Sequence, residues 1–255
     1  MILAIDVGNS NVVIGVIEGE RILRVFRMVT DLLKTEDEYA AGMKSILDFN
    51  GLDARGFDGA AISSVVPPLT NVFREAVRKL TGMPAFVVGS GIKTGLNILI
   101  DNPAELAADM VCSAVAAIAK YAAPAFIIDL GTATKITVID KNGSYIGGAI
   151  CPGVSLSADA LARGASLLPK VMIEAPKKAI CGVTTDAMKS GIVFGAAAMI
   201  DGMLLRFEEE LGSKATVVAT GGLAPAIVPH CRAEIVCDPN LILDGLRILF
   251  EKNKK

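Results

Sequence analysis

One pattern that occurs twice in the chain constrains its fold most: an apolar run ends in an aspartate, and a glycine and small polar residues follow. The first copy ends in Asp6-Val7-Gly8-Asn9-Ser10-Asn11 and the second in Asp129-Leu130-Gly131-Thr132-Ala133-Thr134. The two aspartates are 123 positions apart, as are the two glycines. Further apolar runs follow each copy, separated by Glu18-Gly19-Glu20 in the first half and by Lys141-Asn142-Gly143 in the second. Because Asn-Gly between apolar runs is a strong hairpin signal, the sequence predicts a duplicated three-stranded unit with a carboxylate turn in each half.

The residues of these turns suit the binding of phosphate. Gly8 lets the backbone approach a ligand closely, and Asn9, Ser10 and Asn11 carry short hydrogen-bond donors. A carboxylate repels phosphate, so Asp6 would hold a cation or a water molecule that contacts the phosphate. A single turn of this kind also closes ordinary hairpins, and it is the repetition that favours two turns facing a shared cleft.

The chain is long enough for two compact domains. Its 255 residues fit two domains of about 100 to 150 residues each, and we place the division between residues 1–121 and 122–255. Helices are expected over residues 36–49 and 70–80, with a fully apolar strand over 59–66. Strands that alternate with helices predict an α/β protein with mixed sheets flanked by helices.

Composition and charge exclude several classes of function. The chain has 25 basic and 27 acidic residues, so nothing indicates a nucleic-acid-binding surface. With one histidine, His230, a Ser-His-Asp triad or a histidine-centred metal site is excluded unless His230 belongs to it. The five cysteines lack a Cys-x-x-Cys pair and indicate reduced core thiols of a cytoplasmic protein. The first apolar run breaks at Asp6 and no uncharged run is long enough to cross a bilayer, so we expect neither a signal peptide nor a membrane partner.

Asp109 is the candidate catalytic residue. Asn102-Pro103-Ala104-Glu105 has the capping order of a helix start, and from Leu106 to Ala119 Asp109 is the only ionisable residue. An apolar helix is a buried helix, and an unpaired buried carboxylate is costly unless it is used. Asp109 is therefore a candidate general base. Pairing with a distant lysine, or an exposed position at the helix start, would equally explain it.

Two more segments are rich in glycine. The glycines of Gly147-Gly148-Ala149-Ile150-Cys151-Pro152-Gly153 indicate a segment that passes close either to a ligand or to another backbone. Thr220-Gly221-Gly222-Leu223 follows a predicted strand. It would lie at the edge where open α/β sheets bind ligands.

Taken together, these motifs resemble those of type III pantothenate kinases over nearly the whole chain. In chain order, the motifs that carry the resemblance are Asp6 to Asn11, Thr30-Asp31 with Lys34 to Tyr39, Ser63 to Pro68, Gly91 to Asn97, Asn102-Pro103 with Asp109, Asp129 to Thr134, Gly147-Gly148 with Pro152-Gly153, Ala187-Met188 with Ser190-Gly191, and Thr220 to Ala224. The resemblance implies duplicated ribonuclease H-like domains of the actin-like ATPase superfamily, which also contains acetate and sugar kinases and Hsp70. It also implies a homodimer.

The resemblance further implies an enzyme, a phosphotransferase with an alcohol group as acceptor. The reaction would be ATP-dependent phosphorylation of pantothenate to 4'-phosphopantothenate, the first step of coenzyme A biosynthesis, with Mg²⁺ and a monovalent cation, K⁺ or NH₄⁺. Asp109 would accept the hydroxyl proton, Asp129 would hold the monovalent cation, and Asp6 would hold Mg²⁺ through water. The implied ATP-binding residues are Asp6, Val7, Gly8, Asn9, Ser10, Asn11, Gly131, Thr132, Ala133, Thr134, Gly221 and Gly222. The implied pantothenate-binding residues are Ile100, Ala107, Ala108, Asp109, Met110 and Thr185.

The sequence departs from the family pattern around the acceptor. The family has Tyr where Ile100 stands, Gly-x-Asp-Arg where this chain has Ala107-Ala108-Asp109-Met110, and Thr where it has Lys135. A thioether cannot pair with the acceptor's carboxylate as an arginine does, and Lys135 could either replace that charge or neutralise ATP phosphates. Three hypotheses follow: a pantothenate kinase with a rearranged pocket, a kinase of a less acidic alcohol, and a non-catalytic nucleotide-binding paralogue.

Overall fold

The computed structural model describes residues 1–254, which form two compact units. Unit 1 comprises Met1–Leu96, Asn102–Ala116 and the chain from Leu241 onward, and unit 2 comprises Asn97–Asp101 and Ala117–Asn240. Each unit thus combines segments that are distant in the sequence. These units are defined by packing, whereas the division between residues 121 and 122 concerns the duplication, and that division stays a prediction.

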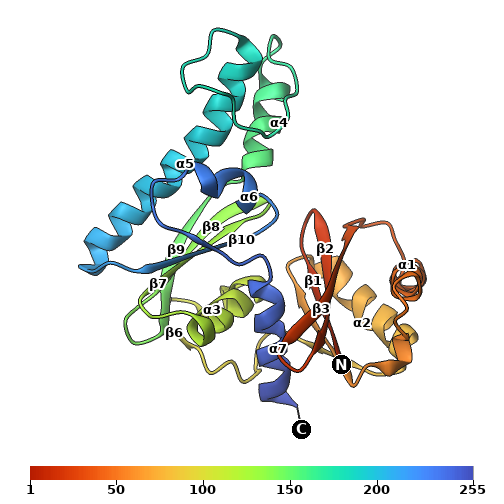
Figure 1. Ribbon diagram of the computed structural model, residues 1–255. Coiled ribbons are helices and arrows are strands. Elements are labelled where there is room, and N and C mark those ends of the chain that lie inside the picture. The colour runs from red at the N-terminus through yellow and green to blue at the C-terminus, as the bar shows by residue number, and fades with distance from the viewer. Residues whose placement is uncertain (255) are drawn as a thin grey trace. The chain divides into compact units, whose positions relative to one another are not determined.

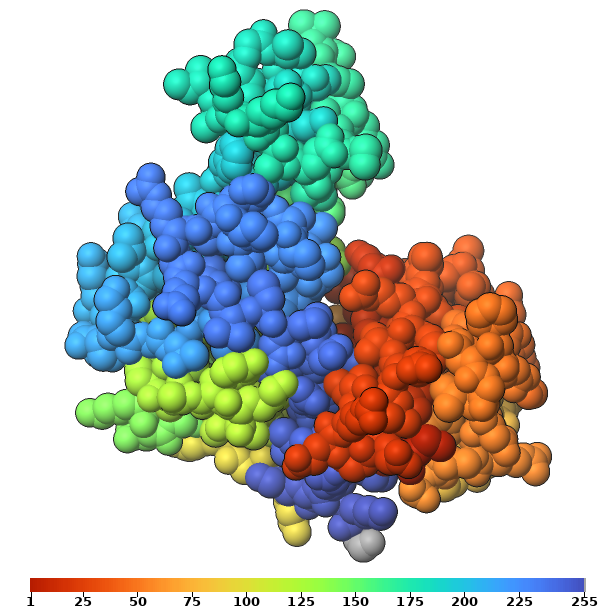
Figure 2. Space-filling model, viewed as in Figure 1, coloured from red at the N-terminus to blue at the C-terminus, as the bar shows by residue number. Residues whose placement is uncertain are grey.

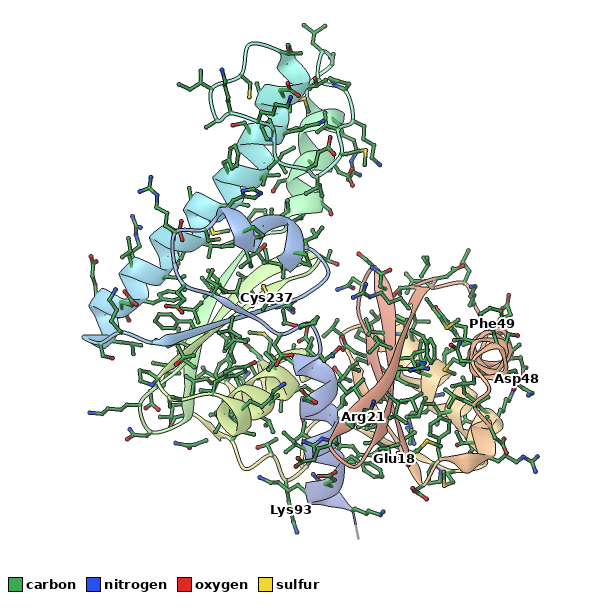
Figure 3. The ribbon with its side chains drawn as sticks, in the orientation of Figure 1. Glu18, Arg21, Asp48, Phe49, Lys93 and Cys237 are labelled. Carbon is green, nitrogen blue, oxygen red and sulfur yellow. The ribbon has the colours of Figure 1, made fainter. Side chains whose placement is uncertain are left out.

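Unit 1 is built on a mixed five-stranded sheet with the strand order β3-β2-β1-β4-β5. Its strands are β1 (Ile2–Val7), β2 (Asn11–Glu18), β3 (Arg21–Val29), β4 (Gly59–Ser64) and β5 (Ala85–Val87). The first three strands pair antiparallel, as predicted, and β4 and β5 extend the sheet in parallel. Glu18 and Arg21 face each other at the hairpin between β2 and β3 (Figure 3).

Helices cover both faces of this sheet (Figure 1). They are α1 (Glu36–Phe49), α2 (Pro67–Thr81), α7 (Leu241–Asn253) and most of α3 (Ala108–Lys120). α1 and α2 bury Tyr39 and Phe73 on one face, and α3 and α7 bury Val115 and Leu246 on the other. At Gly245 of α7 a Cβ atom would lie 2.0 Å from the carbonyl oxygen of Cys112, so only glycine allows α7 to pack this closely on α3.

The ends of α1 and α2 show how the local sequence places helices. α1 begins with a capping box: the N–H of Glu38 donates to Thr35 Oγ1, and the N–H of Thr35 donates to Glu38 Oε2. α2 begins at Pro67 and not at Thr70, because proline in the first helical turn gives up only N–H groups that have no partner within the helix.

Unit 2 repeats the strand pattern of unit 1 in a six-stranded sheet, with the order β11-β10-β7-β8-β9-β6. Its strands are β6 (Asn97–Ile98), β7 (Ala125–Leu130), β8 (Ala133–Ile139), β9 (Ser144–Pro152), β10 (Thr216–Thr220) and β11 (Val236–Cys237). β7, β8 and β9 form an antiparallel meander, and β10 lies parallel to β7. This is the arrangement of β1, β2, β3 and β4 in unit 1.

Besides the last turn of α3, unit 2 contains the α-helices α4 (Val154–Gly164), α5 (Thr184–Leu211) and α6 (Ala224–Ile227). The C-terminal part of α5 packs on the sheet, where Val193 and Ile200 join the same core as Phe126 and Ile128. α4, the beginning of α5 and the segment between them form a lobe that projects beyond the sheet of unit 2 (Figures 1 and 2).

Among residues 1–254, α5 is the one helix long and apolar enough to span a membrane, judged by length and composition alone. A core helix passes the same test, so this is weak evidence for a span. Buried side chains run along α5 from Met188 to Leu204, and 33% of its most apolar window is buried.

The cysteines differ from expectation in one respect. All five have free thiols, but only Cys112 is buried, and Cys237 on β11 is exposed (Figure 3). Core positions were therefore wrongly predicted for Cys151, Cys181 and Cys237, because a lone cysteine carries no periodic signal of burial, whereas Cys231 is partly buried and packs against the core of unit 2.

Candidate active site

The first carboxylate turn joins β1 to β2 and is held by hydrogen bonds to its own backbone. Asp6 is the penultimate residue of β1. The N–H of Gly8 donates to the carbonyl oxygen of Asn11 at 3.0 Å. Thr30, just after β3, donates its hydroxyl to the Gly8 carbonyl at 2.6 Å and its N–H to the Ser10 carbonyl at 3.1 Å. Two carbonyl groups of the turn are thus occupied by Thr30.

The hydrogen bonds from Thr30 leave the turn better suited to bind an anion. A turn that presented its carbonyl oxygens would repel phosphate, whereas Asn9, Ser10 and Asn11 are exposed and carry donors. Thr30 belongs to a motif that carried the family resemblance, but the sequence assigned it no role. The sequence feature that could have indicated the role of Thr30 is a hydroxyl residue directly after the strand that pairs with Asn11.

Asp109 lies in the first turn of α3 and is buried, with 6% of its surface exposed. The helix begins at Ala108 and not at Leu106, so Asp109 is at the helix start, but it is not exposed there. Its Oδ1 accepts the N–H of Met110 at 2.7 Å. A negative charge is favourable at a helix N-terminus, so the position of Asp109 in the first turn of α3 stabilises its carboxylate.

A buried thiol connects Asp109 to the first carboxylate turn. Cys112 is fully buried on α3, one turn after Asp109. Burial, and then the negative charges of Asp6 and Asp109, raise the pKa of the Cys112 thiol well above its usual value. Ser63 is the partner of Asp6 across β1 and β4. The charges of both carboxylates therefore influence the pKa of the same thiol, so Asp6 and Asp109, two of the predicted site residues, lie in the same region of unit 1.

The second carboxylate turn joins β7 to β8 in unit 2. Asp129 is the penultimate residue of β7, and Thr132 is exposed at the turn. Thr134, the partner of Leu130 at the start of β8, is 1% exposed, and its Oγ1 has no hydrogen-bond partner. A buried hydroxyl without a partner costs about 1 to 3 kcal/mol, so a small movement of the turn that brought Oγ1 to a phosphate oxygen would be favourable.

Lys135 contacts the carboxylate of this turn. It is the partner of Asp129 across β7 and β8, and its Nζ lies 2.8 Å from Asp129 Oδ2. The side chains of Lys135 and Asp129 are 17% and 15% exposed. Sequence reasoning noted Lys135 as a departure from the family pattern but did not pair it with Asp129, although the spacing across a short hairpin could have indicated the pair.

The glycine-rich segments lie against backbone. Gly221 has φ +95°, and a Cβ atom there would lie 2.6 Å from the Leu130 backbone. A Cβ atom on Gly153 would lie 2.0 Å from the Thr132 carbonyl oxygen, and one on Gly148 would lie 2.1 Å from that of Ile136. Of the two alternatives for Gly148 and Gly153, close approach of another backbone is therefore the correct one. Gly221, Gly153 and the second carboxylate turn together form one compact edge of unit 2.

The residues expected to bind the acceptor are divided between the two units. Ala107, Ala108 and Met110 adjoin Asp109 in unit 1, whereas Ile100 and Thr185 belong to unit 2. Their convergence concerns the arrangement of the two units, and it stays a prediction. The same holds for the prediction that Asp6 and Asp129 face a shared cleft.

The described part of the chain contains no group of three or more His, Cys, Asp or Glu side chains that could hold a metal ion by themselves. Mg²⁺ in phosphotransferases usually binds through one or two carboxylates and the phosphates of the nucleotide. A single aspartate beside a phosphate turn, as at Asp6, therefore suits Mg²⁺ that arrives with ATP.

Comparison with known proteins agrees with these features. A family model described as type III pantothenate kinase matches residues 2–206. The type III pantothenate kinase of Moorella thermoacetica is 41% identical over 253 residues, which cover 99% of this chain and 100% of that protein.

Two solved structures share the fold. A conserved candidate Baf family transcriptional activator from Campylobacter jejuni has a TM-score of 0.63 at 17% identity and covers 98% of both chains. A ROK family glucokinase from Streptomyces griseus, solved with glucose and AMPPNP, has a TM-score of 0.53 at 13% identity, over 97% of this chain and 98% of that one. At such low identity these likenesses show the fold alone. They confirm the predicted α/β class, the actin-like ATPase fold with mixed sheets flanked by helices.

Proposed function

The chain belongs to the type III pantothenate kinase family, and from this premise we propose that it transfers the γ-phosphoryl group of ATP to the primary hydroxyl of pantothenate. The product is 4'-phosphopantothenate, and the reaction is the first step of coenzyme A biosynthesis. The observation that carries the proposal is the identity of 41% over 99% of the chain with a pantothenate kinase. Nothing in the comparisons favours a different alcohol or a non-catalytic paralogue.

ATP is bound, in this proposal, by the three glycine-containing turns. The first turn offers exposed donors at Asn9, Ser10 and Asn11, and the hydrogen bonds from Thr30 keep carbonyl oxygens of Gly8 and Ser10 from the phosphates. In unit 2 the phosphate-binding residues are Gly131 to Thr134, and Gly221 and Gly222 adjoin the adenosine. Asp6 would hold Mg²⁺ through water, and the ion would supply positive charge that offsets the charge developing on the phosphates.

Asp109 is the proposed general base. The N–H of Met110 holds its Oδ1, so the carboxylate is preoriented before the acceptor arrives. It accepts the proton of the pantothenate hydroxyl as the oxygen attacks the γ-phosphorus and the bond to ADP breaks. Because phosphoryl transfer is catalysed mainly by positioning and charge neutralisation, one base and two phosphate turns are sufficient.

The acceptor pocket comprises Ile100, Ala107, Ala108, Met110 and Thr185 in this proposal. Met110 takes the place of the family's arginine and donates no charged hydrogen bond, which would otherwise contribute about 1.5 to 3 kcal/mol. We therefore expect this enzyme to bind pantothenate more weakly than relatives that have the arginine, and the KM for pantothenate of Met110→Arg measures the difference.

We also propose a homodimer in the cytoplasm. A cavity of about 970 Å³ in unit 2 is lined by Ala160, Leu161, Gly191 and Gly195 of α4 and α5, among other small and apolar residues. On α4, Leu156 and Leu161 are 48% and 40% exposed, so a second copy could bury them. The mass in solution, measured by light scattering, and cell fractionation test these two statements.

The test of the function is pantothenate-dependent turnover of ATP by wild-type protein and by Asp109→Asn. Loss of the base should lower kcat about a hundredfold or more, while the affinity for a fluorescent ATP analogue stays the same. Asp244→Asn, which alters a similarly buried aspartate on α7, is the matched control and should retain turnover. Equal activity of Asp109→Asn and wild type would refute the role of Asp109, and no pantothenate-dependent turnover by wild type would refute the function.

A further inference from the structure

The second carboxylate turn contains a cation that belongs to the chain. Lys135 Nζ lies 2.8 Å from Asp129 Oδ2. The family resemblance predicts K⁺ or NH₄⁺ on this same carboxylate. The ε-ammonium group of lysine carries one positive charge, and it donates hydrogen bonds as NH₄⁺ does. The position predicted for the ion is thus occupied by a group of the same charge and chemistry.

The β-sheet register holds this pair in place. Asp129 and Lys135 are direct partners in the antiparallel ladder of β7 and β8, so their side chains leave the sheet on the same face. On the other side of Asp129 its partner is Thr220 of β10, which is neutral and buried. The register of this hairpin brings the ammonium group to the carboxylate without any ion from solution.

A second cation on Asp129 would be unfavourable. With 17% and 15% of their side chains exposed, Lys135 and Asp129 are screened by water less than a surface pair. A K⁺ ion bound to the same carboxylate would lie close to the ammonium group, and two like charges at such a distance repel. The residues present therefore do not fit a monovalent cation at Asp129.

We propose that Lys135 replaces the monovalent cation, so that this kinase works without K⁺ or NH₄⁺. The proposal rests on the proposed kinase function. Lys135 acts here as a positioning residue: it neutralises Asp129 beside the phosphate-binding residues of unit 2.

The test compares turnover of wild type, Lys135→Thr and Lys135→Arg at constant ionic strength, with choline chloride, KCl or NH₄Cl as the salt. Lys135→Thr restores the residue of the family pattern. We expect wild type and Lys135→Arg to change less than about twofold between salts. In choline chloride the turnover of Lys135→Thr should fall about tenfold to a hundredfold, because one charge-assisted hydrogen bond is lost. Its turnover should recover in KCl or NH₄Cl. Lys120→Thr, which removes the lysine of another Lys–Asp pair in unit 2, is the control and should remain insensitive to the salt.

Thermal unfolding in the same salts gives a second readout that does not need activity. K⁺ relative to choline should raise the Tm of Lys135→Thr and leave that of wild type unchanged. A K⁺-dependent Tm or turnover of wild type, or a Lys135→Thr protein on which K⁺ has no effect, would overturn the proposal. If no variant phosphorylated pantothenate in any salt, the proposed function would fail, and the Tm comparison alone would still decide whether Lys135 replaces the cation.

Discussion

The two carboxylate turns share a strand pattern but differ in what faces the carboxylate. Asp6 lies opposite Val13 in unit 1, whereas Asp129 lies opposite Lys135 in unit 2. Val7 pairs with Val12 across the first turn and Leu130 with Thr134 across the second, so the second turn is one residue shorter. One position in the strand that follows thus distinguishes the two turns: an apolar side chain is the partner of Asp6, and a lysine is the partner of Asp129.

The surroundings of the two turns differ in a second way. Behind the second turn, Gly153 packs directly against the Thr132 carbonyl, whereas the first turn is held by hydrogen bonds from Thr30. Tight packing tolerates less change than hydrogen bonds at the surface, because added volume forces the backbone to move. We therefore expect the second turn to be the more rigid of the two.

Adding one methyl group to each turn should show this difference most strongly. Gly153→Ala places Cβ 2.0 Å from a backbone oxygen although φ is −68°, whereas Gly8→Ala places it 3.0 Å from the oxygen of Asn11. We expect Gly153→Ala to lower the free energy of unfolding by about 3 kcal/mol and Gly8→Ala by about 1 kcal/mol. Denaturant titration measures both, and equal losses would contradict the expected difference in rigidity.

Giving the first turn the lysine of the second should make the two alike. Val13→Lys places an ammonium group opposite Asp6, where it competes with the Mg²⁺ that we assign to this carboxylate. The Mg²⁺ concentration needed for half-maximal turnover should rise about tenfold, which corresponds to roughly 1.4 kcal/mol. Val13→Met, similar in length but neutral, is the control. Unchanged Mg²⁺ dependence in Val13→Lys would contradict the role of Asp6.

The last expected effect is a pH dependence of stability that comes from Cys112, the buried thiol beside Asp6. Its pKa is raised well above the usual value by burial and by Asp6 and Asp109. Above pH of about 8.5 the unfolded chain loses this proton and the folded protein keeps it, so the free energy of unfolding falls with rising pH, by about 1.4 kcal/mol per pH unit. Denaturant titrations between pH 8 and 10 cover both sides of the unperturbed thiol pKa of about 8.5. In them, Cys112→Ala should lack this part of the slope of the unfolding free energy against pH.

The exposed thiol of Cys237 provides the control for that experiment. Cys237→Ala should keep the wild-type slope. Because the comparison uses slopes, any general loss of stability on shortening the buried side chain cancels. The same slope in Cys112→Ala as in wild type would show that the thiol ionises normally in the folded protein.

Sequence reasoning predicted most of the fold correctly because its signals were local. The capping box of Thr35 and Glu38, the hairpin at Asn142-Gly143 and the apolar run of β4 each depend on neighbouring residues. It misplaced the start of α2 by three residues, because the helix begins at Pro67, where proline suits the first helical turn. Asp6, Asp109 and Asp129 were identified as candidates because an aspartate at the end or in the midst of an apolar run is conspicuous.

By itself, then, the sequence determined the duplicated strand pattern, the two carboxylate turns and the lone aspartate of α3, because short-range backbone preferences and apolar periodicity specify them. Only the tertiary structure decided that α7 completes the unit formed by the N-terminal strands, that Gly153 lies behind Thr132, and that Cys112 lies near both Asp6 and Asp109. It also decided that Lys135 contacts Asp129. The physical reason is that such contacts join segments, or opposite positions on paired strands, whose meeting depends on packing and register and not on the residues beside them in the chain.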